Sequence, residues 1–166
     1  MVTDPRLLPL DGETVEGTAA YRAAPDISSR GVWSTFERTF YDVRVFHPNA
    51  VSYRNQSLSS LYSTHEREKM AKYNSRVFTV ERGSFTPLVY SNFGGWAPQA
   101  VRYHKRLAEL ISRKQNEDYH QVINHIRTRV RFSLLRSVLV AVRGERGKRQ
   151  PASQHISVFS VIQHDT

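Results

Sequence analysis

Two apolar-rich runs on either side of a short polar segment constrain the fold of this chain more than any other feature. The runs cover residues 27–33 and 39–46, and residues 34–38 between them are polar except for Phe36. A polar segment of this length can reverse the chain, so the two runs are predicted to pair as an antiparallel hairpin. Such a hairpin brings Asp26, at the start of the first run, towards Asp42 in the second.

The second run sorts its side chains onto two faces, because successive residues of a strand point to opposite sides. One face is mostly apolar and carries Tyr41, Val43 and Val45. Asp42 and Arg44 lie opposite it, and we expect their face to border a cleft or solvent. The hairpin therefore predicts two carboxylates and one cation close together.

The remaining patterns predict an α/β fold: a mixed, mainly antiparallel sheet flanked by helices, with a helical C-terminal part. Further strands are expected over residues 76–81 and 84–91, with Pro87 marking a break or an edge strand. Helices are expected over residues 58–76, 97–114 and 117–143. Residues 1–24 lack a periodic pattern and are predicted to be an irregular lead-in, residues 25–143 one domain, and residues 144–166 a basic tail with a stray strand at 156–162.

The first expected helix carries a stripe that changes character along its length. The stripe begins apolar and continues polar, through Leu58, Leu61, Tyr62, His65, Lys69 and Tyr73. This change indicates a helix that begins in the core and ends at a site. Its N-cap is open between Ser57, Ser60 and a capping box formed by Ser63 and Glu66.

Composition narrows the class of partner. The net charge is +9 with a pI near 10.2, which favours a polyanion, nucleic acid before membrane, although a merely basic surface is the alternative. No segment approaches the ~18 uninterrupted apolar residues of a membrane span. The chain has no cysteine, which predicts a reducing intracellular location, in the nucleus or cytoplasm, and argues against a zinc site.

Basic residues concentrate in the two C-terminal helices. The candidates for contact with a phosphate backbone are Lys105, Arg106, Arg127, Arg129, Arg131 and Arg136. Residues 127, 129 and 131 spread around a helix, so they cannot all face one groove, and a solvated helix face is the alternative. The Gly94-Gly95 pair before a helix either presents backbone N–H groups to a phosphate or is only a turn.

The carboxylate pair suggests chemistry. Phosphodiester hydrolysis uses a metal that binds the scissile phosphate and lowers the pKa of an attacking water. Mg²⁺, or Mn²⁺ in its place, takes oxygen ligands, which Asp26, Asp42 and the carbonyl of Val43 could supply, while Arg44 would neutralise charge at phosphorus. In the alternative, Asp42 and Arg44 are an ordinary surface pair worth ~1 kcal/mol or less.

The order of three motifs resembles a known nuclease superfamily. Pro25-Asp26, then Asp42-Val43-Arg44, then the helical segment KMAKY at residues 69–73 resemble the PD-(D/E)xK pattern of restriction-endonuclease-like nucleases. The longer runs FERTFYDVRVFHPNA, HEREKMAKYNSRV and SFTPLVYSNFGG are similar to a segment towards the C-terminal end of reverse-transcriptase polyproteins of animal retrotransposons. The resemblance covers about residues 25–144.

The resemblance implies roles for individual residues. It implies Asp26 and Asp42 as metal ligands, Arg44 in place of the superfamily's lysine, and Lys69 and Tyr73 as the supporting helix pair. Arg44 departs from the pattern because arginine stays protonated and cannot act as a base. The superfamily's acidic helix residue before the first strand has only Glu13 and Glu16 as poor candidates, as expected of a fragment of a longer reading frame or an inactive copy.

The resulting hypothesis is a metal-dependent DNA endonuclease-like domain of a retrotransposon, which nicks target DNA to provide a 3′ end for reverse transcription. Its expected partners are DNA, RNA and the reverse-transcriptase part of the same polyprotein, with no membrane. Two other hypotheses remain open: a catalytically inactive, basic nucleic-acid-binding module, and a structural piece of a larger polyprotein. For a metal site, we expect removal of either Asp charge to leave folding intact or improved.

Overall fold

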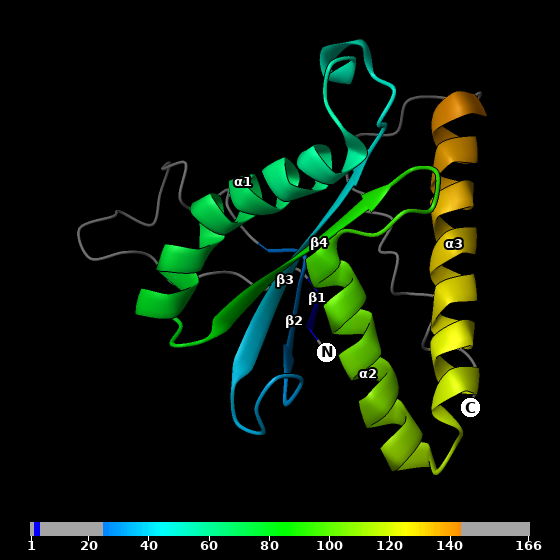
Figure 1. The fold of residues 1–166 in the computed structure, drawn as a ribbon. Helices are drawn as coiled ribbons and strands as arrows, with labels where there is room; N and C mark the ends of the chain where they lie inside the picture. Colours follow the sequence, from blue (N-terminus) through cyan, green and yellow to red (C-terminus); the bar gives the residue numbers. More distant parts are fainter. Residues whose placement is uncertain (1, 4–24, 144–166) are drawn as a thin grey trace, which may run out of the picture.

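The computed structural model describes residues 2–3 and 25–143, which form a mixed α/β arrangement. Its sheet contains β1 (Val2–Thr3), β2 (Ile27–Arg30), β3 (Arg38–Phe46) and β4 (Ser84–Ser91), in that spatial order (Figure 1). β1 and β3 both pair antiparallel with β2, whereas β4 pairs parallel with β3. The predicted hairpin is thus confirmed. Of the predicted irregular lead-in over residues 1–24, the structure describes only β1; residues 4–24, and the basic tail over 144–166 with its strand at 156–162, lie outside the described residues.

Three long helices accompany the sheet: α1 (Leu58–Thr79), α2 (Pro98–Gln115) and α3 (Tyr119–Arg143). A single 3-10 turn, Val51–Tyr53, precedes α1. α1 makes the crossover that a parallel pair requires, between β3 and β4. α1 covers one face of the sheet, and α2 lies on the other with α3 packed beside it (Figure 1).

The strand predicted over residues 76–81 is wrong, because α1 continues to Thr79. Tyr73 and Val77, four residues apart, are both buried in one apolar cluster with Phe85, so the helical period continues through this segment. The chain then turns through Arg82, whose φ is +49°. An alanine at Gly83 would place its Cβ 2.3 Å from the Arg38 carbonyl oxygen, so the turn needs glycine for lack of space.

Helix starts are fixed by local side chains and by one contact between helices. Of the three N-cap alternatives that the sequence left open, the structure has Ser57, whose hydroxyl accepts a hydrogen bond from the Ser60 N–H at the start of α1. Glu66 instead accepts a 2.8 Å hydrogen bond from the Gln99 N–H in the first turn of α2. A residue in the middle of α1 therefore accepts a hydrogen bond from one of the backbone N–H groups at the start of α2, which lack partners within their own helix.

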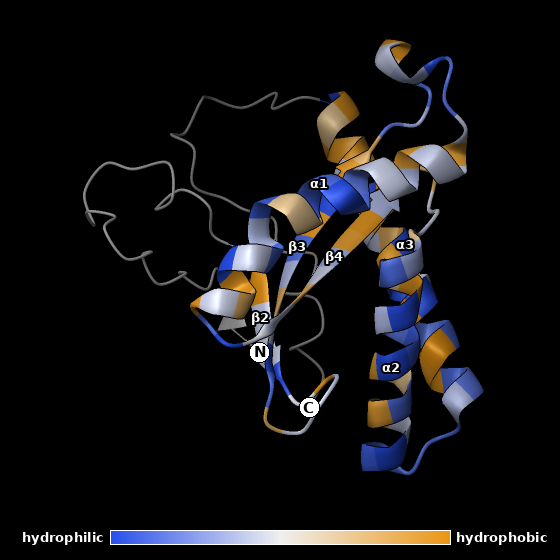
Figure 2. Cartoon of the chain, turned by 60° about the vertical axis from the view of Figure 1, so that its left-hand side comes forward, coloured by the Kyte–Doolittle hydropathy of each residue, from blue (hydrophilic) through white to orange (hydrophobic). Residues whose placement is uncertain are grey.

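The two faces of the sheet bury different groups. The face under α2 holds the largest apolar cluster, which includes Tyr41, Leu88 and Tyr103. The face under α1 holds two smaller clusters, one around Phe40 and one around Phe46. In Figure 2 much of β4 is coloured as hydrophobic, whereas the outward turns of α2 are hydrophilic.

Pro87 lies in β4 opposite Asp42 of β3. β4 is the last strand in the described sheet, and a proline is tolerated at an edge because no further strand needs its missing N–H. The edge position predicted for Pro87 is confirmed. No helix in the described ranges is long and apolar enough to cross a membrane.

Candidate functional site

The hairpin brings Asp26 near Asp42. Ile27, the first residue of β2, pairs with Tyr41 of β3, and Asp26 comes just before it, in a bend outside the strand. Both carboxylates act on one group of α1, since the charges of Asp42 and Asp26 both raise the pKa of Tyr73. The predicted convergence of the two carboxylates is supported by this shared neighbour.

The Asp26 carboxylate is held by the backbone of β3. Its Oδ2 accepts a 2.7 Å hydrogen bond from the Val43 N–H. The N–H and C=O of one residue in an extended strand point to the same edge, so the Val43 carbonyl faces the side of β3 on which Asp26 lies. The Asp26 carboxylate and the Val43 backbone therefore meet just before the start of β2.

Asp42 lies beneath α1, between the clusters around Phe40 and Phe46. It is only 4% exposed, so the expectation that its face borders a cleft or solvent is wrong at this position. Burying a charged carboxylate is costly unless it is paired. Lys69 of α1 forms that pair, with Nζ in contact with Asp42 Oδ2.

Tyr73 completes the group, one turn after Lys69 on α1. Burial raises the pKa of its hydroxyl, and so do the charge of Asp42, a hydrogen bond to Asp42 and the charge of Asp26. Tyr73 is therefore a neutral donor facing two carboxylates. We call Asp26, Asp42, Lys69 and Tyr73 the acidic cluster; it joins residues predicted separately from the hairpin and the helix stripe.

Arg44 does not pair with Asp42, as the alternative of an ordinary surface pair would have it. It lies on the α1 face, as Asp42 does, but its Nη1 donates a 2.5 Å hydrogen bond to Glu68 Oε2. This guanidinium lowers the pKa of Glu68. The cation in contact with the Asp42 carboxylate is thus Lys69, whereas Arg44 forms a half-exposed pair with Glu68.

His65 is a further buried group beside the acidic cluster. Its ring packs 4.5 Å from the Phe46 ring, between centroids, and its Nδ1 lies 3.6 Å from Glu68 Oε2. Burial lowers the pKa of His65, with the charge of Arg44 acting in the same direction. His65 was predicted only as part of the stripe, and Glu68 was not predicted at all, because its helical position gives no sign of the strand residue it faces.

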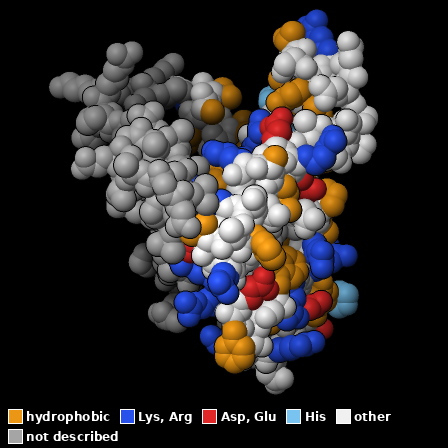
Figure 3. Space-filling view, turned by 90° about the vertical axis from the view of Figure 1, so that its left-hand side faces the viewer, with side chains coloured by type: hydrophobic (Ala, Val, Ile, Leu, Met, Phe, Trp, Pro, Cys, Tyr) orange, Lys and Arg blue, Asp and Glu red, His pale blue; other side chains and the backbone are white. Residues whose placement is uncertain are grey.

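The surface over this side of the molecule is mixed in sign. Figure 3, which faces the α1 side, shows Lys and Arg side chains interspersed with Asp and Glu instead of gathered in one patch. Two charges of α1 are paired with charges of β3, Lys69 with Asp42 and Glu68 with Arg44. The buried charges on this side are thus largely compensated within the protein.

The donors of the acidic cluster fit a hard cation. Mg²⁺ is typically held by one or two carboxylates, with waters and phosphate oxygens as its other ligands. Asp26, Asp42 and the Val43 carbonyl offer that chemistry, although no group of three or more His, Cys, Asp or Glu able to hold a metal occurs among the described residues. A cation bound at Asp42 would take the place that the Lys69 ammonium holds.

The six basic candidates separate into different environments. Lys105, Arg127 and Arg131 line one pocket between α2, α3 and the loop after β4. Arg106 points elsewhere: its Nε donates to the Val32 carbonyl at 2.8 Å and its Nη1 contacts Glu109. Arg129 and Arg136 do not line the pocket. Residues 127 and 131 are four apart and share a helix face, as expected from the argument that 127, 129 and 131 cannot all face one groove.

The glycine pair before α2 does not present free N–H groups to a phosphate. The Gly94 N–H donates to the Ser91 carbonyl, and the Gly95 N–H donates to the Ser91 hydroxyl, both at 3.0 Å. Gly94 has a φ of +86°, which favours glycine. Of the two possibilities that the sequence left open, the turn is supported.

Comparison with family models, with curated proteins and with solved structures finds no match to this chain. The acidic cluster, the pocket and the charge of the chain are the features that bear on its function.

Proposed function

We propose that this chain is a divalent-metal-dependent DNA endonuclease domain of the restriction-endonuclease-like class, belonging to a retrotransposon polyprotein. The observation that carries the proposal is the acidic cluster: Asp26 is held beside Asp42 by the Val43 N–H, Lys69 contacts Asp42 from α1, and Tyr73 of α1 lies close to both carboxylates. These are four of the five residues that the PD-(D/E)xK resemblance marks; the fifth, Arg44, pairs with Glu68.

The arrangement supports a division of roles. Asp26 and Asp42, with the Val43 carbonyl, would hold the metal, which when bound supplies a Lewis acid and lowers the pKa of a coordinated water. Lys69 lies at the carboxylate, where the resemblance expected the strand cation to act. Lys69 is therefore the cation beside Asp42 that would stabilise negative charge at phosphorus.

The other groups position the site. Tyr73 donates to Asp42 and fixes the orientation of that carboxylate. Arg44 is held by Glu68, at the rim of the cluster, where 33% of its side chain is exposed. A guanidinium at this position can receive a phosphate oxygen of an incoming strand and stabilise its charge.

A second candidate function, a nucleic-acid-binding module without cleavage, is favoured by a specific observation. Lys105, Arg127 and Arg131 line one pocket whose lining contains no acidic residue. With a net charge of +9, binding to a polyanion needs no metal site. Cleavage distinguishes the two candidates.

The test is a nicking assay on supercoiled plasmid with Mg²⁺ or Mn²⁺, and with EDTA as the metal-free arm. We expect wild-type protein to nick only with metal. Asp42→Asn and Asp26→Asn should each lower the rate by at least about a hundredfold, because each removes an anionic ligand. Binding without nicking in either metal would reject the endonuclease and leave the binding module.

The matched control is Asp118→Asn, which makes the same chemical change at a distant position. Asp118 accepts hydrogen bonds from the His120 and Gln121 N–H groups at the start of α3. Asparagine caps helices about as well as aspartate, so this variant should nick at the wild-type rate. Each variant is first checked for a cooperative thermal transition, so that loss of nicking is separated from loss of fold.

A further inference from the structure

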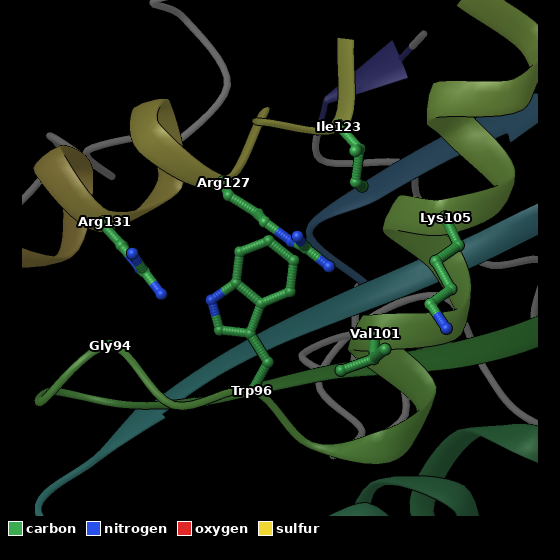
Figure 4. Close-up of a pocket in the computed structure, with 7 residues that line it drawn as sticks. All are labelled: Gly94, Trp96, Val101, Lys105, Ile123, Arg127 and Arg131. Atoms are coloured by element: carbon green, nitrogen blue, oxygen red, sulfur yellow. The ribbon is translucent and has the colours of Figure 1, made fainter. Parts of the chain in front are cut away.

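The pocket between α2 and α3 lies on the other side of the sheet from the acidic cluster. Its volume is about 300 Å³, which is at the lower end of the ~300–1,000 Å³ of small-ligand pockets. Its lining residues come from the loop after β4, from α2 and from α3: Gly94, Trp96, Val101, Lys105, Ile123, Arg127 and Arg131. Figure 4 shows the Trp96 ring with Arg131 on one side and Lys105 on the other, and the Arg127 side chain overlapping the ring in this view.

The pocket holds three cations without a compensating carboxylate. Across residues 25–143, Lys105, Arg127 and Arg131 form no ion pair with Asp or Glu. All three are exposed, so they are solvated and ready to exchange water for an anion. Two arginines one helical turn apart can contact successive or shared oxygens of a phosphate.

Trp96 gives the pocket a second kind of recognition. One side of the indole is supported by His104, whose ring centroid lies 4.5 Å away, and its edge meets Tyr90. Trp96 is itself only partly buried, and the pocket is open beside it. Burial lowers the pKa of His104 to about 4, so the supporting imidazole is neutral and the indole remains a stacking platform for a planar ring.

We propose that this pocket binds one unpaired nucleotide of a single-stranded nucleic acid, with its base on Trp96 and its phosphates on Arg127, Arg131 and Lys105. An aromatic platform next to a basic groove is the general arrangement by which proteins bind single strands without sequence preference. A duplex does not fit the same contacts, because its bases are stacked on one another and cannot enter a pocket of this size. The proposal rests on the proposed function only in taking nucleic acid as the ligand, and it requires no cleavage.

The first experiment follows the fluorescence of the single tryptophan in Trp33→Phe, which leaves Trp96 as the only indole. It is titrated with oligodeoxythymidine in EDTA, so that failure of nicking has no influence on the result. We expect the oligonucleotide to quench Trp96, and a duplex of equal length to leave its emission unchanged. Unchanged emission on saturation with the single strand, or equal quenching by the duplex, would overturn the proposal.

The second experiment measures affinity by anisotropy of the labelled oligonucleotide over a range of salt. Arg127→Ala/Arg131→Ala should weaken binding at least about tenfold and flatten the slope of log affinity against log salt by ~1.4, from ~0.7 per phosphate contact in a single strand. Arg113→Ala/Lys114→Ala removes the same charge at the far end of α2 and should change the affinity less than about threefold. Equal effects in the two double variants would overturn the proposal, because only net charge would then matter.

Two further arms distinguish the source of the phosphate and the role of the indole. Thymidine monophosphate and inorganic phosphate should compete only at concentrations far above the oligonucleotide; competition at the same concentration would reject a strand as the ligand. Trp96→Leu, checked for a wild-type far-ultraviolet spectrum, should lower affinity about tenfold. An unchanged affinity in this variant would contradict stacking on Trp96.

Discussion

The two sides of the sheet treat charge in opposite ways. Under α1, the Asp42 carboxylate is buried and paired with Lys69, and Arg44 is paired with Glu68. Beside α2 and α3, Arg127 and Arg131 line an open pocket with no carboxylate in its lining. One side is a closed, internally compensated cluster, and the other is an open, positive surface.

The difference follows from where the cations lie. A charge beneath a helix must be neutralised by the protein because water cannot reach it, whereas a charge at a pocket rim is solvated. The α1 side is therefore suited to hold a small cation and a reacting phosphate in a fixed geometry. The α2–α3 side is suited to attract a long polyanion at little cost in stability.

The largest expected effect tests whether the buried charges on the α1 side neutralise each other. Asp42→Asn leaves the Lys69 ammonium without its carboxylate in a mostly buried position, so we expect a loss of about 3 kcal/mol in the free energy of unfolding. This revises the expectation that removing the Asp42 charge leaves folding intact, because that expectation did not include Lys69 as a partner. Chemical denaturation of Asp42→Asn, Lys69→Met and the double variant measures the coupling.

The double variant sharpens the comparison. Asp42→Asn/Lys69→Met should regain at least half of the lost stability, because it removes both members of the pair. It should still fail to nick DNA, which separates the catalytic loss from the folding loss. Additive losses in the double variant would show that the two side chains do not compensate each other.

A smaller effect compares the two buried histidines, one on each side. Burial lowers the pKa of His104 from 6.5 to about 4, so the unfolded chain binds a proton at a higher pH than the folded protein. The stability contributed by neutral His104 is complete above pH 6.5 and is lost as the pH falls towards 4, by about 1.5 kcal/mol between pH 6.5 and 5.

Two variants show which histidine causes this dependence of the free energy of unfolding on pH. His104→Gln retains a polar partner for the Tyr90 hydroxyl, 2.8 Å from His104 Nε2, and should flatten the dependence of stability on pH in that window. His65→Gln should flatten it less, because the nearby Glu68 opposes the lowering of the His65 pKa. Denaturation of the three proteins at pH 5, 5.75 and 6.5 checks this, and an undiminished slope in His104→Gln would be the contrary result.

The smallest expected effect tests the open side. Arg127→Ala removes an exposed cation without an ion-pair partner among the described residues, so the free energy of unfolding should change by less than about 0.5 kcal/mol. Thermal denaturation of Arg127→Ala and of Lys69→Met at two salt concentrations compares the two losses of stability. A loss comparable with that of Lys69→Met would mean that the pocket arginine has a structural role and that the contrast between the two sides does not hold.

Local patterns were sufficient for several parts of this protein. The spacing of apolar runs predicted the hairpin, and through its register the approach of Asp26 to Asp42. The helical stripe predicted that Lys69 and Tyr73 share a face. These predictions succeeded because strand and helix periods are short-range properties of the chain.

The sequence by itself thus determined which side chains share a face and how the hairpin aligns them. Only the tertiary structure decided their partners: the crossover of α1 buried Asp42 against Lys69, turned Arg44 to Glu68, and replaced the strand expected at residues 76–81 by the end of a helix. The packing of α3 against α2 likewise gathered Trp96, Lys105, Arg127 and Arg131 into one pocket. The physical reason is that pairing and burial depend on contacts between elements distant in sequence, which no local period encodes.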